Sequence, residues 1–277
     1  MMAPFNSVIQ RMEMSIQQRL KYLPVVSFYG KTRGWPFVVA WIHRITGILL
    51  VLYVWFHIYT LSFLKFPEIF DAKMKFFRFF LFVFLEWLLA VPVIFHALNG
   101  GRLILYESFS NRENESMIRW VLCLSVIYVS FLGVMMIMGN QTISPVFFWA
   151  LMLIVSIILG YLVGSRIWNT GNSVAWRLQR MTGVFLFTMI PAHMMFMHLA
   201  PAFGHESAVI IERMRNGFIK FVDLSIIVAV LFHGGYGLVS IAKDYLTSRN
   251  HLYGVISCVA VVIVVFGWLG IRLIFSV

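Results

Sequence analysis

The sequence predicts an all-α integral membrane protein, and three observations lead to this prediction. Hydrophobic residues occupy 61% of the 277 positions and charged residues only 12%, whereas soluble domains carry about 25% charged residues. The apolar residues are gathered in seven continuous runs, each close to the roughly 20 residues that a helix needs to cross a bilayer. The runs do not alternate apolar with polar residues, as the strands of a membrane β-barrel do.

The seven runs define the expected transmembrane helices. They cover residues 37–64, 76–105, 117–138, 146–167, 178–200, 218–243 and 252–275. Residues 1–36 contain no clean apolar run and carry scattered basic residues, so we expect an interfacial, cytoplasmic segment there that contacts a partner. Cys123 and Cys258 both stand in the middle of apolar runs, which predicts two buried thiols and no disulfide.

The net charge of +11 would suggest nucleic acid in a soluble protein. Here the basic residues lie in short loops between apolar runs, so we expect no nucleic-acid partner. If the N-terminus is cytoplasmic, 14 of the 22 Lys and Arg residues fall on the cytoplasmic side. Cytoplasmic loops of membrane proteins carry an excess of basic residues, so an N-in orientation is favoured.

A pattern of polar residues occurs twice along the chain. Arg44, Thr46 and Gly47 open the first run, and the same residue types recur 136 positions later, as Arg180, Thr182 and Gly183, at the start of the fifth run. Ten residues after each glycine stands a histidine, His57 in the first copy and His193 in the second.

The following run of each copy continues the same register. His96 and His233 are 137 positions apart, and each is followed four residues later by a glycine. Ten residues before each of them stands an acid, Glu86 in the first copy and Asp223 in the second. Two parallel three-helix repeats joined by one linker helix are therefore predicted, because helices four spans apart run the same way. The expected units are residues 37–138, the connecting helix within 139–170, and residues 171–277.

The four repeated histidines predict a cofactor. Polar side chains in the hydrocarbon region are costly and usually functional. His57 and His193 share one depth in the membrane, and His96 and His233 share another. Two histidines facing each other across a helix bundle are the axial ligands that a b-type haem requires, so two bis-histidine haems are predicted.

Basic residues near the cytoplasmic helix ends are candidate partners for haem propionates. Arg44, Arg102 and Arg180 hold these positions. The other four histidines are not assigned to iron: His43 is expected at a membrane interface, His198 turned away from His193, and His205 and His251 in loops.

These residues resemble the two-haem cytochrome b membrane anchor of succinate dehydrogenase and fumarate reductase, the succinate:quinone oxidoreductases. The family opens a span with a basic residue, Ser or Thr, and Gly, followed ten residues later by a haem histidine. A second haem histidine precedes a stretch of small residues, as His96 and His233 do here. The resemblance covers about 37–105 and 176–243.

The resemblance implies that His96 and His233 bind the haem proximal to the iron–sulfur subunit, and that His57 and His193 bind the distal haem. It implies flavoprotein and iron–sulfur partners on the cytoplasmic face of a bacterial inner membrane, and a quinone substrate, with menaquinone favoured because there are two haems. The chain carries no nucleotide motif, so it cannot oxidise succinate by itself. A higher oligomer of the complex stays open.

The chain departs from that family in two respects. Fused two-haem anchors have five spans, and seven are expected here. Some fumarate reductases also carry a glutamate two residues before the last haem histidine, implicated in proton transfer, and Leu231 occupies that position.

Quinone chemistry couples electrons to protons, so a quinone site needs an ionisable group. Glu86 and Asp223 are candidates at a distal site, and Arg44 with His43 marks a rival proximal site. Two other readings stay open at this stage. One is another di-haem membrane cytochrome, and the other is a haem-free transporter built from parallel repeats, in which the same residues relay protons.

Overall fold

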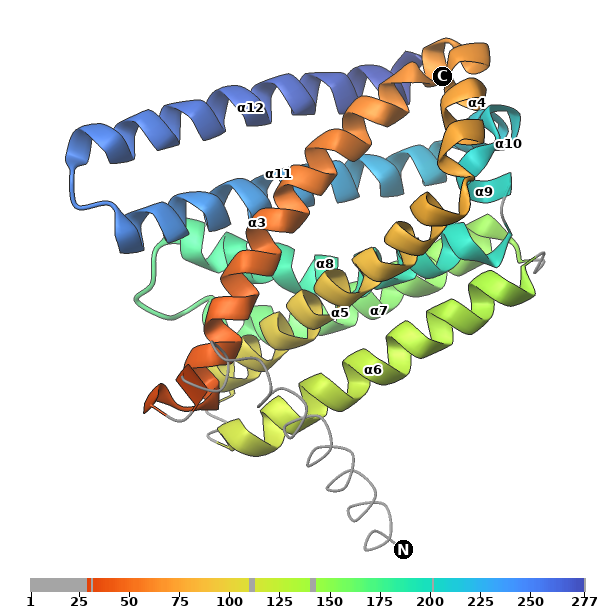
Figure 1. The fold of residues 1–277 in the computed structure, drawn as a ribbon. Coiled ribbons are helices and arrows are strands. Elements are labelled where there is room, and N and C mark those ends of the chain that lie inside the picture. The colour runs from red at the N-terminus through yellow and green to blue at the C-terminus, as the bar shows by residue number, and fades with distance from the viewer. Residues whose placement is uncertain (1–28, 31, 110–112, 140–142, 201, 277) are drawn as a thin grey trace, which may run out of the picture.

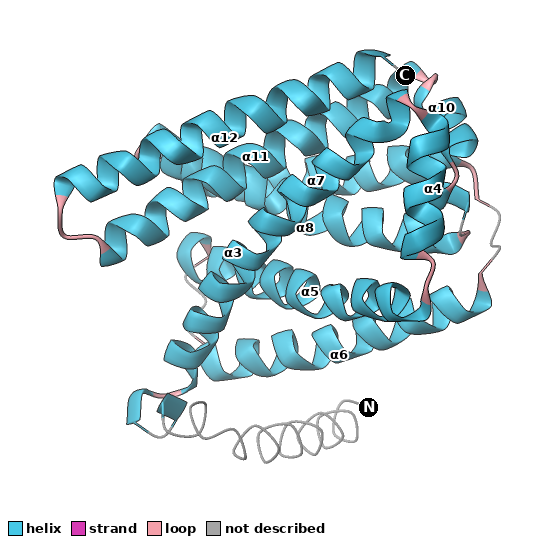
Figure 2. Cartoon of the chain, turned by 45° about the horizontal axis from the view of Figure 1, so that its top comes forward, coloured by secondary structure: helices cyan, strands magenta, loops and turns pink. Residues whose placement is uncertain are grey.

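The computed structural model describes residues 29–276 apart from 31, 110–112, 140–142 and 201. Every regular element in this part of the chain is a helix (Figure 1, Figure 2). Seven of these helices are long and apolar enough to cross a membrane, which confirms the predicted all-α membrane fold. They are α3 (Trp35–Leu61), α5 (Phe80–Ser108), α6 (Asn114–Met138), α7 (Pro145–Ile167), α8 (Val174–Leu199), α11 (Gly217–Tyr245) and α12 (Arg249–Ser276).

Several helix starts have a local cause in the sequence. Proline stands in the first turn of α3 and of α7, where its missing N–H removes no helical hydrogen bond. Ser173 caps α8 by accepting a hydrogen bond from the backbone N–H of Trp176 at 3.2 Å. Asn216 caps α11 in the same way, with the N–H of Phe218 at 3.0 Å. Such caps satisfy donors that the first turn of a helix leaves unpaired.

Short helices that the sequence analysis did not predict gather at one end of the bundle, beside the C-terminus (Figure 1). They are η1 (Ser62–Lys65), α4 (Pro67–Phe77), α9 (Ala202–His205) and α10 (Ser207–Met214). The expected start of the second span at residue 76 is therefore wrong, because α4 ends at Phe77 and α5 begins at Phe80. The Asp71 carboxylate joins α4 to α10 by accepting hydrogen bonds from the backbone N–H and the hydroxyl of Ser207, at 3.0 and 2.8 Å.

Four helices form the inside of the bundle and three lie outside it. The inner helices are α3, α5, α8 and α11, with α3 packed on α5 and α11, and α8 packed on α5 and α11. On the outside, α6 packs on α5, α7 on α8 and α12 on α11. The end of the bundle that holds α4, α9 and α10 is called the distal end below, and the end where α3 begins and α11 ends is called the proximal end.

The outer faces of the bundle are apolar. Phe80, Val264 and Ile137 are among the large hydrophobic side chains exposed there, at 79%, 70% and 87% of their surface. Such a surface is expected where lipid tails surround the helices. Cys123 is buried as predicted, but Cys258 is exposed, so the prediction of two buried thiols is wrong for Cys258. It stands on α12, one of the outer helices, where an apolar sequence run does not imply burial within protein.

Candidate functional site

The four repeated histidines line one internal cavity. The cavity has a volume of about 640 Å³ and runs between α3, α5, α8 and α11. Arg44 and Asp244 line its proximal end, and Arg213 and Asp223 line its distal end. Apolar side chains form most of the wall between them, as in many cofactor sites.

Within this cavity the histidines form two pairs of equivalent residues. The ring centres of His57 and His193 are 6.2 Å apart, and those of His96 and His233 are 6.4 Å apart. In both pairs the ring planes are 86° apart. Along α3 the two pairs are separated by about 15 Å, because His57 is ten residues beyond Gly47, which touches His96.

The separation within each pair fits two imidazoles on opposite sides of one metal ion. A metal–nitrogen bond is about 2 Å long, so ring centres about 6 Å apart would leave room for one metal ion held by both imidazoles. No group of three or more His, Cys, Asp or Glu side chains in the described residues could hold a metal ion. A haem needs only two protein ligands, because its macrocycle supplies the other four nitrogens.

The Thr–Gly part of the repeated motif positions the histidine of the next inner helix. The Thr46 hydroxyl oxygen and the His43 carbonyl oxygen lie 3.3 and 3.1 Å from Nδ1 of His96. In the second copy the Thr182 hydroxyl oxygen lies 3.4 Å from Nδ1 of His233. Partners on Nδ1 leave Nε2 available, as in metal-bound histidines whose second nitrogen is held by the protein.

The glycine of each motif allows the histidine ring to approach the helix backbone. A Cβ atom added at Gly47 would lie 3.0 Å from Cε1 of His96, and one added at Gly183 would lie 3.2 Å from Cε1 of His233. A larger residue at either position would therefore displace the ring. The motif was visible in the sequence, but this contact was not predictable, because it joins two different helices.

His43, which was expected at a membrane interface and was not assigned to iron, lies beside His96. Its ring stacks on the ring of His96, with centres 3.9 Å apart and planes 7° apart, and it lines the cavity. Its Nδ1 is buried and has no hydrogen-bond partner among the described residues. The equivalent residue, Gln179, donates a hydrogen bond to the carbonyl oxygen of His233 at 3.2 Å. Both residues therefore pack beside a predicted ligand.

The predicted propionate partners fall into two classes. Arg44 and Arg180 line the cavity, whereas Arg102 is not among the lining residues. The buried Arg102 side chain instead donates hydrogen bonds to Asn99 and Asn114, the former at 2.8 Å.

Arg44 and Arg180 also form ion pairs between inner helices. Arg44 lies 2.8 Å from Asp244, and Arg180 makes two hydrogen bonds to Glu107 at 2.7 and 2.9 Å. Glu107 and Asp244 are 137 positions apart, so the two ion pairs are equivalent. Neither acid was predicted from the sequence, although the two are separated by the same 137 positions as His96 and His233.

Both predicted acids line the distal part of the cavity, but their surroundings differ. Glu86 is near two histidines: Nε2 of His198 is 3.8 Å from one carboxylate oxygen and Nε2 of His205 is 4.0 Å from the other. Asp223 instead interacts with Arg213. Burial lowers the pKa of the Arg213 guanidinium from its ordinary value, and the Asp223 charge raises it.

Four residues at the distal and proximal ends lie where the sequence did not predict them. Arg213 was not predicted; it lines the cavity, and its Nε is buried without a partner among the described residues. His205 ends the helix α9 and His251 lies in the first turn of α12, so neither is a loop residue. His198 lines the same cavity as His193, although it was not assigned to iron and was expected to turn away.

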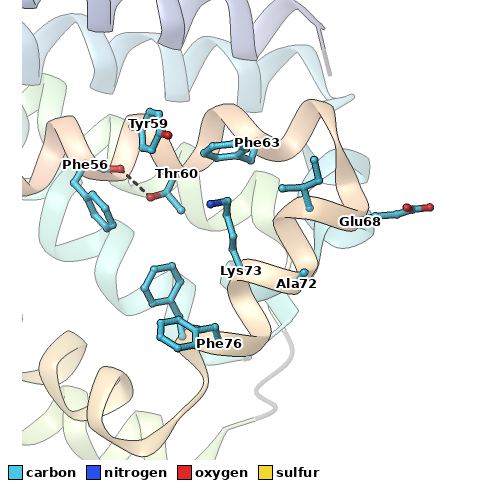
Figure 3. Close-up of a pocket in the computed structure, with 10 residues that line it drawn as sticks. Phe56, Tyr59, Thr60, Phe63, Glu68, Ala72, Lys73 and Phe76 are labelled. Carbon is cyan, nitrogen blue, oxygen red and sulfur yellow. Dashed lines mark hydrogen bonds between the residues drawn. The ribbon is translucent and has the colours of Figure 1, made fainter.

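A second hollow lies on the surface between the end of α3 and α4 (Figure 3). It has a volume of about 770 Å³, and its lining includes Phe56, Phe63 and Phe76. Lys73 points toward the end of α3 in Figure 3, with its ammonium 4.3 Å from the centre of the Phe63 ring. None of the predicted site residues lines this hollow.

Comparison with known proteins adds independent information. A family model described as the succinate dehydrogenase/fumarate reductase transmembrane subunit matches two segments of the chain, residues 30–133 and 164–269. The chain is also 28% identical over 93 residues to the succinate dehydrogenase 2 membrane subunit of Mycobacterium tuberculosis; the match covers 32% of this chain and 68% of that protein. No solved structure matches the chain. The two matched segments span most of its length, and the chain belongs to the family of succinate dehydrogenase/fumarate reductase transmembrane subunits.

Proposed function

We propose that this chain is the membrane-anchor cytochrome b subunit of a succinate:quinone oxidoreductase, with two b-type haems held by His57 with His193 and by His96 with His233. The observation that carries the proposal is the pairing of equivalent histidines at 6.2 and 6.4 Å inside one cavity. When bound, the haems supply one-electron redox chemistry, and two of them link the proximal end of the bundle to the distal end.

The chain's own residues would hold and orient these groups. Thr46 and Thr182 fix the rings of His96 and His233, and Gly47 and Gly183 let those rings pack against the neighbouring helix. His193 Nδ1 is buried and has no hydrogen-bond partner among the described residues, and its ring lies 6.2 Å from the ring of Trp149, centre to centre.

Arg44 and Arg180 remain proposed propionate partners. Each is paired with a carboxylate, but a guanidinium has five N–H donors and can bind a second anion. Arg102 would have to release the two asparagines to which its side chain donates hydrogen bonds outside the cavity before it could bind a propionate. Arg213 is a further proposed propionate partner, because its Nε at the distal end is buried and has no hydrogen-bond partner among the described residues.

We also propose that the chain arose by duplication of a three-helix unit. Equivalent residues meet in both histidine pairs and in the contact of Asp71 with Ser207. Residues related by a two-fold axis contact each other where the axis passes between them. The separate family matches at 30–133 and 164–269 support the same view, with α7 as the connecting helix.

The proposed partners are a flavoprotein and an iron–sulfur subunit on the cytoplasmic side of a bacterial inner membrane, with the N-terminus on that side. This placement puts Arg44, Arg180 and the His96–His233 pair nearest the partners. The proposed substrate is a membrane quinone, with menaquinone favoured, and Glu86 and Asp223 are its candidate proton groups at the distal end. The position of Glu86 beside two imidazoles favours it over Asp223.

The test is a dithionite-reduced minus oxidised spectrum of the purified protein, together with histidine variants. We expect two low-spin b haems per chain. His57→Ala and His193→Ala should each remove the same haem, and His96→Ala and His233→Ala should each remove the other, because each pair shares one iron. His251→Ala is the control. A protein without a Soret band would contradict the proposal and favour the transporter.

A co-purifying flavoprotein would separate this anchor from other di-haem cytochromes. The complex should then reduce or oxidise a quinone at the expense of succinate or fumarate. A haem-containing chain that purifies without a flavoprotein from membranes that hold the full complex would support the other cytochromes.

A further inference from the structure

Three titratable side chains from different elements meet at the distal end of the cavity. Glu86 stands on α5, His198 near the end of α8, and His205 at the end of α9. The two imidazole Nε2 atoms approach different carboxylate oxygens of Glu86, at 3.8 and 4.0 Å. The carboxylate therefore lies between two groups that can each exchange a proton with it.

The cluster connects the cavity to the end of the bundle. Glu86 and His198 line the cavity, and His205 is outside its lining. The helix α9, which ends at His205, lies among the short helices at the distal end (Figure 1). A proton accepted at Glu86 thus has neighbours on its way from the cavity wall to the distal surface.

The distances from the Glu86 carboxylate to the two imidazoles suit proton transfer and not a rigid salt bridge. Both exceed the 2.7–3.2 Å typical of direct hydrogen bonds, so one bridging water or a small side-chain rotation completes the contact. Imidazole takes up and releases a proton near neutral pH, and its nitrogens can act as donor or acceptor. Carboxylates and imidazoles are the usual groups of proton relays within membranes.

The neighbouring charged groups are few. Tyr53 on α3 interacts electrostatically with Glu86. The ion pair of Arg78 with Glu206, at 3.6 Å, involves the residue that follows His205. Arg213 interacts electrostatically with Asp223 and with His193, and His193 also interacts with His198.

The cluster occurs once, not twice. The positions equivalent to His198 and His205, 136 residues earlier, hold Ser62 and Ile69. Asp223, the equivalent of Glu86, has Arg213 beside it instead of a histidine. A purely architectural feature of the repeat would be expected in both copies, so the difference indicates a function on one side of the bundle.

We propose that Glu86, His198 and His205 form a proton relay between a quinone at the distal end of the cavity and the aqueous phase; the relay rests on the proposed function. A proton leaves the hydroxyl group of a hydroquinone and binds the Glu86 carboxylate, giving the neutral acid. Glu86 passes it to Nε2 of His205, which becomes an imidazolium and releases it to water, while His198 holds or returns a proton at the cavity wall. The reverse sequence supplies protons for quinone reduction. Only protons move along the relay.

The test uses the complex purified with its partner subunits and reduced dimethylnaphthoquinone as electron donor, with fumarate as acceptor. The variants are Glu86→Gln, His198→Gln, His205→Gln and the double histidine variant, with His251→Gln as the matched control. Each is assayed for haem content by difference spectrum and for turnover with and without added imidazole. Fumarate reduction by an artificial dye donor, which bypasses the quinone, is measured in parallel.

We expect Glu86→Gln and the double histidine variant to lower quinol-dependent turnover by about 10²-fold, the lower end of the range for lost acid–base catalysis. Haem content and dye-dependent turnover should be unchanged, and imidazole should restore turnover in the histidine variants. His251→Gln should behave as wild type.

Two kinds of failure are distinguishable. Absence of haem or of quinol-dependent turnover in the wild-type complex would contradict the proposed function itself. With both present, wild-type turnover in the double histidine variant would overturn the relay alone. Lost turnover that imidazole does not restore, accompanied by lost haem or lower thermal stability, would likewise overturn it and assign the cluster to packing of α9.

Discussion

At the scale of single residues, the most specific contact in the structure joins a glycine on one helix to a histidine on the next. Gly47 faces His96 and Gly183 faces His233 across gaps too small for a normal side chain. The motif Arg-x-Thr-Gly therefore has a mechanical explanation. Threonine holds Nδ1 of the ring and glycine leaves room for the ring, so the imidazole is oriented from two sides.

This contact predicts the effect of adding one methyl group. In Gly47→Ala the new Cβ would lie 3.0 Å from Cε1 of His96, so the ring must shift, at a cost of about 1–3 kcal/mol as in other overpacked sites. We expect weaker binding and a shifted midpoint potential of the proximal haem only, measured by redox titration of the absorption spectrum. Gly183→Ala should affect the same haem through His233.

The control for this prediction is Gly254→Ala. Gly254 lies on the outer helix α12, and a Cβ atom added there would meet nothing within 4 Å. Its haem spectrum should equal that of the wild type. An unchanged proximal haem in both Gly47→Ala and Gly183→Ala would contradict the assignment of His96 and His233.

At the scale of elements, two equivalent ion pairs join helices at the proximal end. Arg44 near the start of α3 pairs with Asp244 near the end of α11, and Arg180 near the start of α8 pairs with Glu107 near the end of α5. Both cations stand in the early turns of their helices and both acids in the last turns. The helix dipole therefore disfavours the two acids, which lie in the last turns of α5 and α11, and the paired arginines compensate their charge.

The two ion pairs should differ in strength. The side chains of Arg180 and Glu107 are 23% and 31% exposed, against 36% and 49% for Arg44 and Asp244, and Arg180 binds both carboxylate oxygens. In double-mutant cycles in which glutamine replaces Arg44, Arg180 and Glu107 and asparagine replaces Asp244, we expect a coupling energy of about 1 kcal/mol for Arg180–Glu107 and less for Arg44–Asp244. Reversible unfolding in detergent measures both.

Salt provides the check on that prediction. Raising the ionic strength from 0.01 to about 0.15 M shortens the Debye length from roughly 30 to 8 Å, so the coupling of the more exposed pair should fall further. Equal coupling energies that do not respond to salt would show that the two contacts stabilise the bundle by packing and not by charge.

At the scale of the whole molecule, each proposed haem takes one histidine from each half of the chain. His57 and His96 belong to the first half, and His193 and His233 to the second. Neither half can therefore complete a site alone. The cavity between α3, α5, α8 and α11 exists only when both halves are assembled.

This arrangement predicts the behaviour of a divided chain. A break in the turn between α7 and α8, after Thr170, gives fragments of residues 1–170 and 171–277 and leaves every described helix intact. Co-expressed fragments should assemble and bind two haems, whereas either fragment expressed alone should bind none. The measurement is the haem-to-protein ratio of the purified membrane fraction. Bound haem in one fragment alone would contradict the sharing of ligands between halves.

Much of the architecture could be predicted from the sequence because its causes are local. A bilayer imposes a length and a hydropathy on every span, and all seven runs became helices. The end of α4 at Phe77 was not predicted, because the aromatic residues that follow it are as apolar as those of a span. The exposure of Cys258 was not predictable either, because lipid-facing and buried positions of a membrane helix can have the same composition.

The candidate site likewise has features that could be predicted from the sequence and features that depend on tertiary packing. Which histidines pair was predictable from their spacing along the chain, and the structure brings those pairs to 6.2 and 6.4 Å. The positions of His43 and Arg102 relative to the cavity were not predictable from the sequence, because neighbouring side chains decide whether a residue near a helix end faces the cavity.

By itself the sequence determined the membrane fold, the seven spans and the four paired histidines, because hydropathy and repeat spacing are properties of the chain taken in order. Only the tertiary structure decided which side chains surround them. It brought His198 and His205 to Glu86, the Thr–Gly motif to the next helix's histidine, and Glu107 to Arg180. These contacts join residues on different helices, and their partners depend on how the helices pack, which no local pattern of residues specifies.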